Sequence, residues 1–168
     1  MENKRVNLRP HHFFDIIRAF GKESLALAEG KDGGIKPHPY QHSFHKIAKI
    51  IRISPDLKIK IVVKCDSVCE GCIHCKSGRC DDRINYRKDF ASKEKLNDYA
   101  DKRIMEKCLI KEGEALTPAQ LCQKAGLYLD NIDFIYSGND SWHTKQRKED
   151  AIEGLNYYSK LHKFVFLR

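Results

Sequence analysis

The cysteines of this chain are concentrated in one short segment. Five of the seven occur in the sequence KCDSVCEGCIHCKSGRCDD, which begins at Lys64. Cys69, Cys72 and Cys75 form C-x2-C-x2-C, and Cys80 follows after four residues. Thiolates at this spacing can reach one metal ion or cluster, and the two glycines of the segment allow the backbone to wrap around it. We therefore predict a metal-binding loop over residues 65–81.

Two kinds of metal centre fit the loop. A [4Fe–4S] cluster is the leading prediction, with Cys69, Cys72, Cys75 and Cys80 as ligands, although ferredoxins have one residue fewer before the last cysteine and then a proline. The alternative is a structural Zn²⁺ bound by Cys69, Cys72 and Cys80, with Cys75, His74 or Cys65 as the fourth ligand. A redox-active dithiol is a third interpretation, but such dithiols usually occur beside a βαβ pattern, which this sequence does not show. A loop of free thiols is the fourth.

A second group of reactive side chains precedes the loop, and its histidines are His11, His12, His38, His42 and His45. His11 and His12 lie one helical turn before Asp15, and His42 and His45 would share one face of a second predicted helix. Asp15 stands in an apolar stretch, so it needs a partner, and a neighbouring histidine is the expected one. Imidazoles with a carboxylate can bind Fe(II) or Zn²⁺, or serve as general acid and base. These six residues are the predicted catalytic site. The alternative is that the histidines only bind loop carbonyls or face solvent.

The elements that must position these groups are predicted from periodicity and capping signals. Pro10 opens a helix that ends near Phe20, followed by a loop over residues 21–40 that includes a short helix around Leu25–Glu29. The other expected helices are Phe44 to Ile51, Ser92 to Cys108, a short one from the capping box at Thr117 to Gly126, and Thr144 to Lys163. A strand is expected from Leu57 to Val63, and residues 127–136 fit either a strand or a helix. Cys108 and Cys122 fall in helical patterns and are predicted to be core residues. In the last helix, Ala151, Leu155, Tyr158 and Leu161 are expected to face inward. The fold class is α+β, mostly helical with a small sheet.

Composition narrows the protein class. The 168 residues suffice for one domain over residues 1–168, and 41% hydrophobic content excludes wholesale disorder. No apolar run is long enough to span a membrane, and no apolar signal core follows the first charges, so we expect a cytoplasmic protein. The net charge of +8 permits nucleic-acid binding, but the bases are scattered among acids, which favours a solvated basic surface.

The stretches LRPHHFFDIIRAFG, PHPYQHSFH and CDSVCEGCIHCKSGRCDD together resemble a small prokaryotic family, domain of unknown function (DUF) 1284, over about Leu8 to Leu121. The resemblance implies iron–sulfur binding through Cys69, Cys72 and Cys80. Many members of that family carry a cysteine three residues after the second histidine of the R-P-H-H motif, where this chain has Asp15. The fourth ligand is therefore open between Cys75, Cys65, His74 and Asp15.

Three functions follow from these observations. The first is a metalloprotein with an iron–sulfur cluster beside a His/Asp pocket, which would act in redox or proton-transfer chemistry with a small molecule or an electron-transfer partner. The second is a structural zinc knuckle that binds a partner or nucleic acid. The third is a hydrolase with its metal at the His/Asp site. Whether the chain is an enzyme is left open by all of these patterns.

Overall fold

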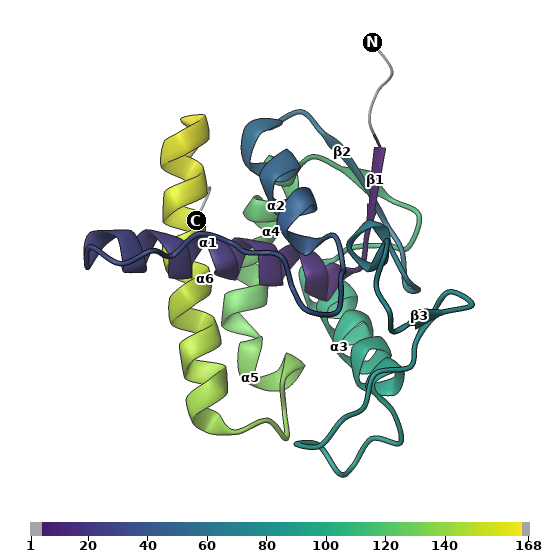
Figure 1. The fold of residues 1–168 in the computed structure, drawn as a ribbon. Helices are drawn as coiled ribbons and strands as arrows, with labels where there is room; N and C mark the ends of the chain where they lie inside the picture. The colour runs from purple at the N-terminus through teal and green to yellow at the C-terminus, as the bar shows by residue number, and fades with distance from the viewer. Residues whose placement is uncertain (1–4, 166–168) are drawn as a thin grey trace.

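The computed structural model describes residues 5–165 and shows a mostly helical α+β fold, which confirms the predicted class (Figure 1). In chain order the elements are β1 (Arg5–Leu8), α1 (Pro10–Ala28), α2 (Phe44–Ile53), β2 (Lys58–Ile61), η1 (Ser67–Cys69), β3 (Cys75–Lys76), β4 (Arg79–Cys80), α3 (Lys93–Cys108), β5 (Ala115–Leu116), α4 (Pro118–Asp130), α5 (Ile132–Ile135) and α6 (Ser141–His162). No helix within this described range is both long and apolar enough to cross a membrane.

The larger sheet places the start of α1 beside the Cys loop. Its strand order is β1-β2-β5, with β1 parallel to β2 and β5 antiparallel to β2. Exposed and buried residues alternate along β1 and β2, so each strand buries one face. Leu8 pairs with Ile61 at the end of the register. The predicted strand over Leu57–Val63 is confirmed in its central part. The two strands are parallel, so their carboxyl ends lie at the same end of the sheet. The segments that follow them carry His11 and His12 and the loop cysteines, and both therefore leave the sheet at this end.

Helix α1 is longer than predicted, because Gly21 does not end it. The helix continues to Ala28, so it includes the first eight residues of the stretch expected as a loop and nearly all of the short helix expected there. At Gly21 it packs closely against α6, and the two helices cross in Figure 1. A Cβ atom at Gly21 would lie 2.0 Å from the Asp150 carbonyl oxygen, and one at Gly154 would lie 1.9 Å from that of Ile17. These glycines therefore permit a close helix crossing.

The remaining helices match the sequence signals with two exceptions. Helices α2 and α3 follow the predicted ranges closely, and the capping box at Thr117 is present at the start of α4. Gly126 does not end α4, which continues to Asp130, so the ambiguous stretch after it is helical. In α6, Ala151, Leu155 and Tyr158 are buried as expected, but Leu161 is 46% exposed, and its predicted inward position is wrong.

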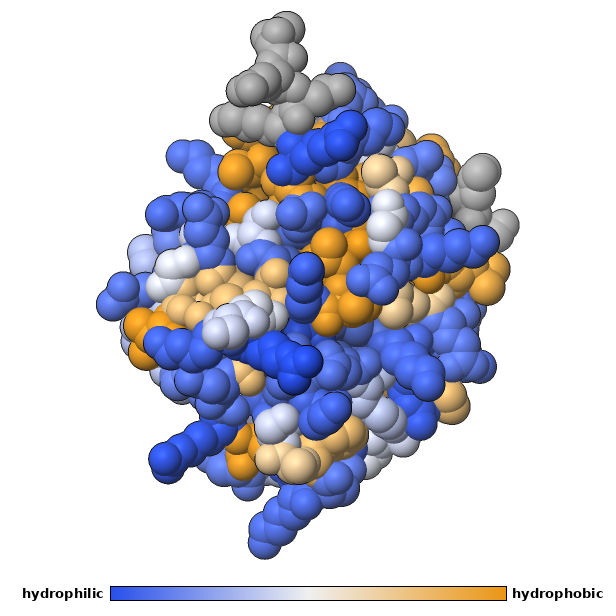
Figure 2. Space-filling model, turned by 90° about the vertical axis from the view of Figure 1, so that its right-hand side faces the viewer, coloured by the Kyte–Doolittle hydropathy of each residue, from blue (hydrophilic) through white to orange (hydrophobic). Residues whose placement is uncertain are grey.

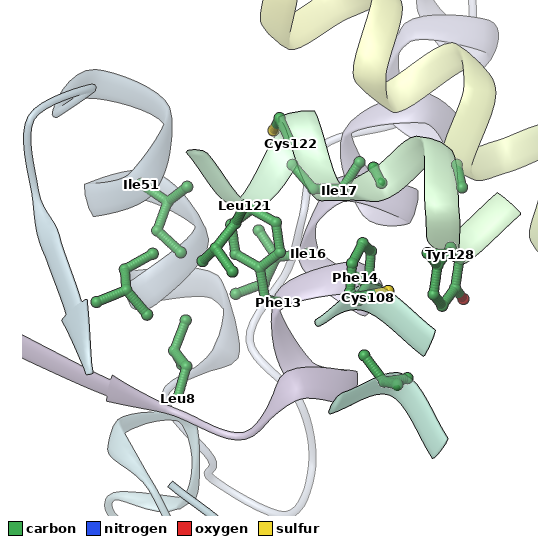
Figure 3. Packing of buried hydrophobic residues seen from close by; sticks show 14 of the residues in the cluster. Leu8, Phe13, Phe14, Ile16, Ile17, Ile51, Cys108, Leu121, Cys122 and Tyr128 are labelled. Atoms are coloured by element: carbon green, nitrogen blue, oxygen red, sulfur yellow. The ribbon is translucent and has the colours of Figure 1, made fainter. Parts of the chain in front are cut away.

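One continuous hydrophobic core joins the sheet to the helices (Figure 3). Phe13 and Phe14 of α1 are fully buried, and the Phe14 ring stacks on Tyr128 at 4.0 Å between centroids. Cys108 and Cys122 lie within this core, as predicted. The outer face that includes the β3 side of the molecule is largely hydrophilic, with only small apolar patches (Figure 2).

The two core cysteines should resist alkylation as long as the protein is folded. Both side chains are fully buried, and burial raises the pKa of Cys108 to about 12 and also raises that of Cys122. Mass spectrometry after iodoacetamide treatment of chelator-treated protein should therefore show at most the five loop thiols modified, and all seven in denaturant. Native modification of Cys122 at the rate of the loop thiols would contradict this packing.

Candidate metal centre

The R-P-H-H segment lies where β1 becomes α1. Arg9 is extended and Pro10 occupies the first helical position, so His11 and His12 fall in the first turn of α1. Two carboxylates from distant parts of the chain bind this turn. Asp66 accepts a hydrogen bond from the Arg9 backbone N–H at 2.6 Å, and Asp101 accepts one from that of His11 at 2.9 Å. The two unpaired backbone amides are thereby satisfied.

The same two carboxylates orient the imidazoles. His11 Nδ1 lies 2.7 Å from Asp101 Oδ1, and His12 Nδ1 lies 2.8 Å from Asp66 Oδ2. An ionised carboxylate only accepts, so each Nδ1 donates its proton to it, and the neutral form of each ring has its unprotonated nitrogen at Nε2. Within the described residues, no hydrogen bond or ion pair of these two rings uses Nε2. Carboxylate, Nδ1–H and free Nε2 form the arrangement in which histidine binds metals.

Electrostatic attraction stabilises the His12–Asp66 and His11–Asp101 pairs. Burial favours the neutral carboxyl group, but the His12 charge and hydrogen bond outweigh it and lower the pKa of Asp66. Asp101 behaves in the same way: burial opposes ionisation, and His11 and Arg9 lower its pKa. Burial also opposes the charged form of His12, yet Asp66 raises the pKa of that imidazole.

Arg9 ties the histidine turn to helix α3. Its side chain is 1% exposed, and its guanidinium forms ion pairs with Glu94, Asp98 and Asp101 at 3.1, 2.9 and 2.6 Å. Burial disfavours the charged guanidinium, but Asp101 and the other acids outweigh it and raise the Arg9 pKa. The arginine of R-P-H-H is thus a positioning residue, which fixes Asp101 against His11.

Local turns shape the Cys loop. Asp66 Oδ1 accepts hydrogen bonds from the backbone N–H groups of Val68 and Cys69, at 3.0 and 3.3 Å, and so caps η1. Successive turns follow, because the Cys72 N–H donates to the Cys69 carbonyl and the Cys75 N–H donates to that of Cys72. The hairpin of β3 and β4 then pairs Cys75 with Cys80. Asp66 therefore controls both His12 and the turn that carries Cys69.

The segment around His38 and His42 covers this loop. The Ser43 N–H donates to the Val68 carbonyl at 2.8 Å, and the Ile73 N–H donates to the Tyr40 carbonyl at 3.0 Å.

The His38 and His42 rings stack at 4.3 Å between centroids. Burial and the neighbouring His38 lower the pKa of His42. The predicted shared face of His42 and His45 is wrong, because His42 precedes α2, which begins at Phe44.

A pocket of about 270 Å³ lies where these elements meet. Its walls include most of both predicted groups, namely His11, His12, Asp15, His38, His42, His74, Cys69, Cys72 and Cys80. The predicted residues Cys75 and His45 do not line it. His45 is partly buried, and its Nδ1 has no hydrogen-bond partner among the described residues. The thiols and the imidazoles that sequence patterns indicated separately thus share one pocket.

Beside the pocket, one set of side chains is close enough for a single ion. Ligand atoms of His12, Asp66 and Cys69 all lie within 4.8 Å of one another. A cluster is larger than a single ion and holds its thiolates further apart. The short distances within this set therefore support binding of a single metal ion, and they do not test binding of a cluster. Burial, and next the Asp66 carboxylate, raise the pKa of Cys69 to about 12, so a bound metal has to displace the thiol proton.

Comparison with known proteins assigns the chain to a family. The family model described as "Protein of unknown function (DUF1284)" matches residues 38–136, more than half of the chain. The chain belongs to the DUF1284 family. The matched segment contains the whole Cys loop and begins after the R-P-H-H motif. No curated protein and no solved structure matches the chain. Family membership, the Cys loop and the His/Asp/Cys group are together compatible with metal binding.

The pocket of this DUF1284 protein distinguishes among the loop cysteines. Cys69, Cys72 and Cys80, the C-x2-C-x7-C set, line the pocket, whereas Cys65 and Cys75 do not. Contacts with Cys75 and Cys69 contribute to the raised pKa of Cys65, after the larger effect of burial. A thiol set that lines one pocket beside free imidazole nitrogens fits either an iron–sulfur cluster or a zinc ion.

Asp15 is paired differently from the prediction. Its Oδ1 lies 3.0 Å from Arg18 Nη1 and 2.7 Å from Arg147 Nη1, so its ion-pair partners are arginines and not a histidine. Burial opposes ionisation, but Arg147 and Arg18 outweigh it and lower the Asp15 pKa. The expected histidine partner was wrong because Arg147 is far away in sequence, and the histidines are held by Asp66 and Asp101 instead.

Proposed function

We propose that this DUF1284 protein binds a [4Fe–4S]-type cluster in the central pocket through Cys69, Cys72 and Cys80, with His12 as the fourth ligand. The observation that carries the proposal is the shared pocket, whose walls include these three cysteines and both histidines of the R-P-H-H turn. Three thiolates and one imidazole lie within the range of ligand sets used by iron–sulfur proteins.

Elimination supports His12 as the fourth ligand. Asp15 is neutralised by two arginines, and Cys65 and Cys75 lie outside the pocket. His74 lines the pocket, but its two ring nitrogens face Asp81 and Asp82, at 2.9 and 3.7 Å. His12 lines the same pocket as Cys69, and Asp66 fixes its ring through Nδ1, which leaves Nε2 for a ligand bond. His12 therefore has both the proximity and the orientation that a ligand requires.

The chain's own residues would support redox chemistry coupled to protons. A bound cluster supplies one-electron transfer. His11 lines the same pocket, and with Nδ1 held by Asp101 it can accept or release a proton at Nε2. Arg9 and Asp101 keep this ring in place. The electron donor or acceptor in this proposal is a small molecule in the pocket or a separate electron-transfer partner.

Anaerobic purification tests the proposal directly. The protein should be brown, contain iron and acid-labile sulfide in equal amounts, and lose its visible absorption when exposed to oxygen or dithionite. Reconstitution with iron and sulfide should restore the colour if it is lost during purification. A colourless protein with stoichiometric zinc, prepared anaerobically and resistant to reconstitution, would refute the cluster.

A single zinc ion is the second candidate. The group of His12, Asp66 and Cys69 favours it, because these ligand atoms are close enough for one ion. With an open position, such a site would suit hydrolysis, and without one it would stabilise the fold. The elemental analysis described above separates this candidate from the cluster.

A further inference from the structure

A second cavity borders the central pocket. Its volume is about 80 Å³, and it shares four lining residues with the central pocket: His11, Asp15, Lys93 and Asn97. The two cavities thus lie on either side of these side chains. A molecule bound in one would contact the same His11 ring that faces the other.

Basic side chains outnumber acidic ones in the walls of the smaller cavity. Arg87, Lys93 and Arg147 line it, whereas Asp15 is the one acidic residue among its lining side chains. Tyrosine hydroxyls and asparagine amides provide further hydrogen-bond donors around the same space. This composition favours an anion over a cation or an apolar group.

The two guanidinium groups are held in place. Arg87 is 5% exposed in its side chain, and Asp89 accepts from its Nε at 2.8 Å and from its Nη2 at 2.7 Å. Arg147 contacts Asp15 and Tyr136 through Nη1, and its guanidinium carbon lies 4.2 Å from the Tyr136 ring centroid. Within the described residues, the hydrogen bonds and ion pairs of Arg147 leave Nε and Nη2 unused. Two parallel donors on a fixed guanidinium match a carboxylate or phosphate.

We propose that the smaller cavity binds the oxyanion group, a carboxylate or a phosphate, of a small-molecule substrate whose remainder enters the central pocket. Pockets for whole drug-sized ligands typically have a volume of roughly 300 Å³ or more, so this cavity is too small for such a ligand, but it can hold one oxyanion group. The role as a substrate site rests on the proposed function, whereas anion binding itself does not. His11, which lines both cavities, would contact the substrate next to its anchored end.

Calorimetric titration of the full-length protein with inorganic phosphate and, separately, with acetate tests the site. Ionic strength is kept constant with sodium chloride. At least one probe should bind with a dissociation constant below about 10 mM, and Lys93→Met should weaken binding about tenfold, because a charge-assisted hydrogen bond is lost. Lys95→Met is the matched control, since Lys95 lies on the same helix and lines neither cavity. It should leave the affinity unchanged.

The two probes distinguish the source of the oxyanion, because preferential binding of phosphate indicates a phosphorylated substrate and preferential binding of acetate a carboxylic acid. No binding of either probe, or equal weakening by Lys93→Met and Lys95→Met, would overturn the proposal. Phosphate or acetate binding should survive Cys69→Ser, and the iron content should survive Lys93→Met. Failure of this inference is therefore distinguishable from failure of the proposed cluster.

Discussion

Replacing Cys69 by serine is expected to abolish binding of the metal centre, whereas replacing Cys75 by serine should leave it in place. Both cysteines belong to the same loop and to the same C-x2-C-x2-C pattern. Only Cys69 lines the central pocket and lies beside His12. Loss of a ligand should lower metal affinity by more than the roughly 10- to 100-fold that loss of a supporting contact costs.

Iron, sulfide and zinc contents measured in parallel on the two variants provide the test, with circular dichroism to verify that each is folded. If Cys75→Ser lost the metal as completely as Cys69→Ser, Cys75 would be a ligand and the assignment of His12 would be wrong. His12→Ala and His45→Ala form a second matched pair, because both are histidines of the predicted site and only His12 lines the pocket. The metal should be lost in the first and retained in the second.

Local sequence signals predicted most of the helices and both groups of reactive side chains. Helical periodicity, Ser92 and the capping box at Thr117 act over a few residues, so their effects are visible in sequence. The loop expected from residue 21 onward and the helix end expected at Gly126 were both wrong, and both positions are glycines within helices. Glycine costs a helix only about 1 kcal/mol, which tertiary packing such as the α1–α6 crossing readily offsets.

The partners of the histidines could not be predicted, because they come from distant parts of the chain. Asp66 and Asp101 were missed as functional residues, although Asp66 stands directly after Cys65 and begins an Asp-Ser-x-x capping pattern. Asp101 lies one residue after Ala100 on the buried side of α3, where an acid needs a cation. Its cation is Arg9, which sequence analysis treated only as part of a motif.

The ion network between Arg9 and Asp101 should be the most sensitive point for stability outside the hydrophobic core. Asp101→Asn removes a charge that Arg9 and His11 both contact, at 2.6 and 2.7 Å, in a fully buried position. Arg9 keeps Glu94 and Asp98 as partners, but the lost charge-assisted hydrogen bonds to Arg9 and His11 should still lower the free energy of unfolding by about 1.5–3 kcal/mol. Asp98→Asn is the control, because Asp98 also pairs with Arg9 but is 43% exposed, and it should cost less than about 1 kcal/mol.

Urea unfolding of both variants, repeated over a range of pH, provides the measurement. The pKa of Asp101 is lowered in the folded protein, so its contribution is fully present above the unfolded-state pKa of about 3.9 and is lost as pH falls toward the folded value. The difference between wild type and Asp101→Asn should therefore be constant near neutral pH and shrink below about pH 4. Equal destabilisation by Asp98→Asn and Asp101→Asn at neutral pH would mean that charge number, rather than burial, determines the strength of this network, and Arg9 would no longer explain how the histidine turn is held against α3.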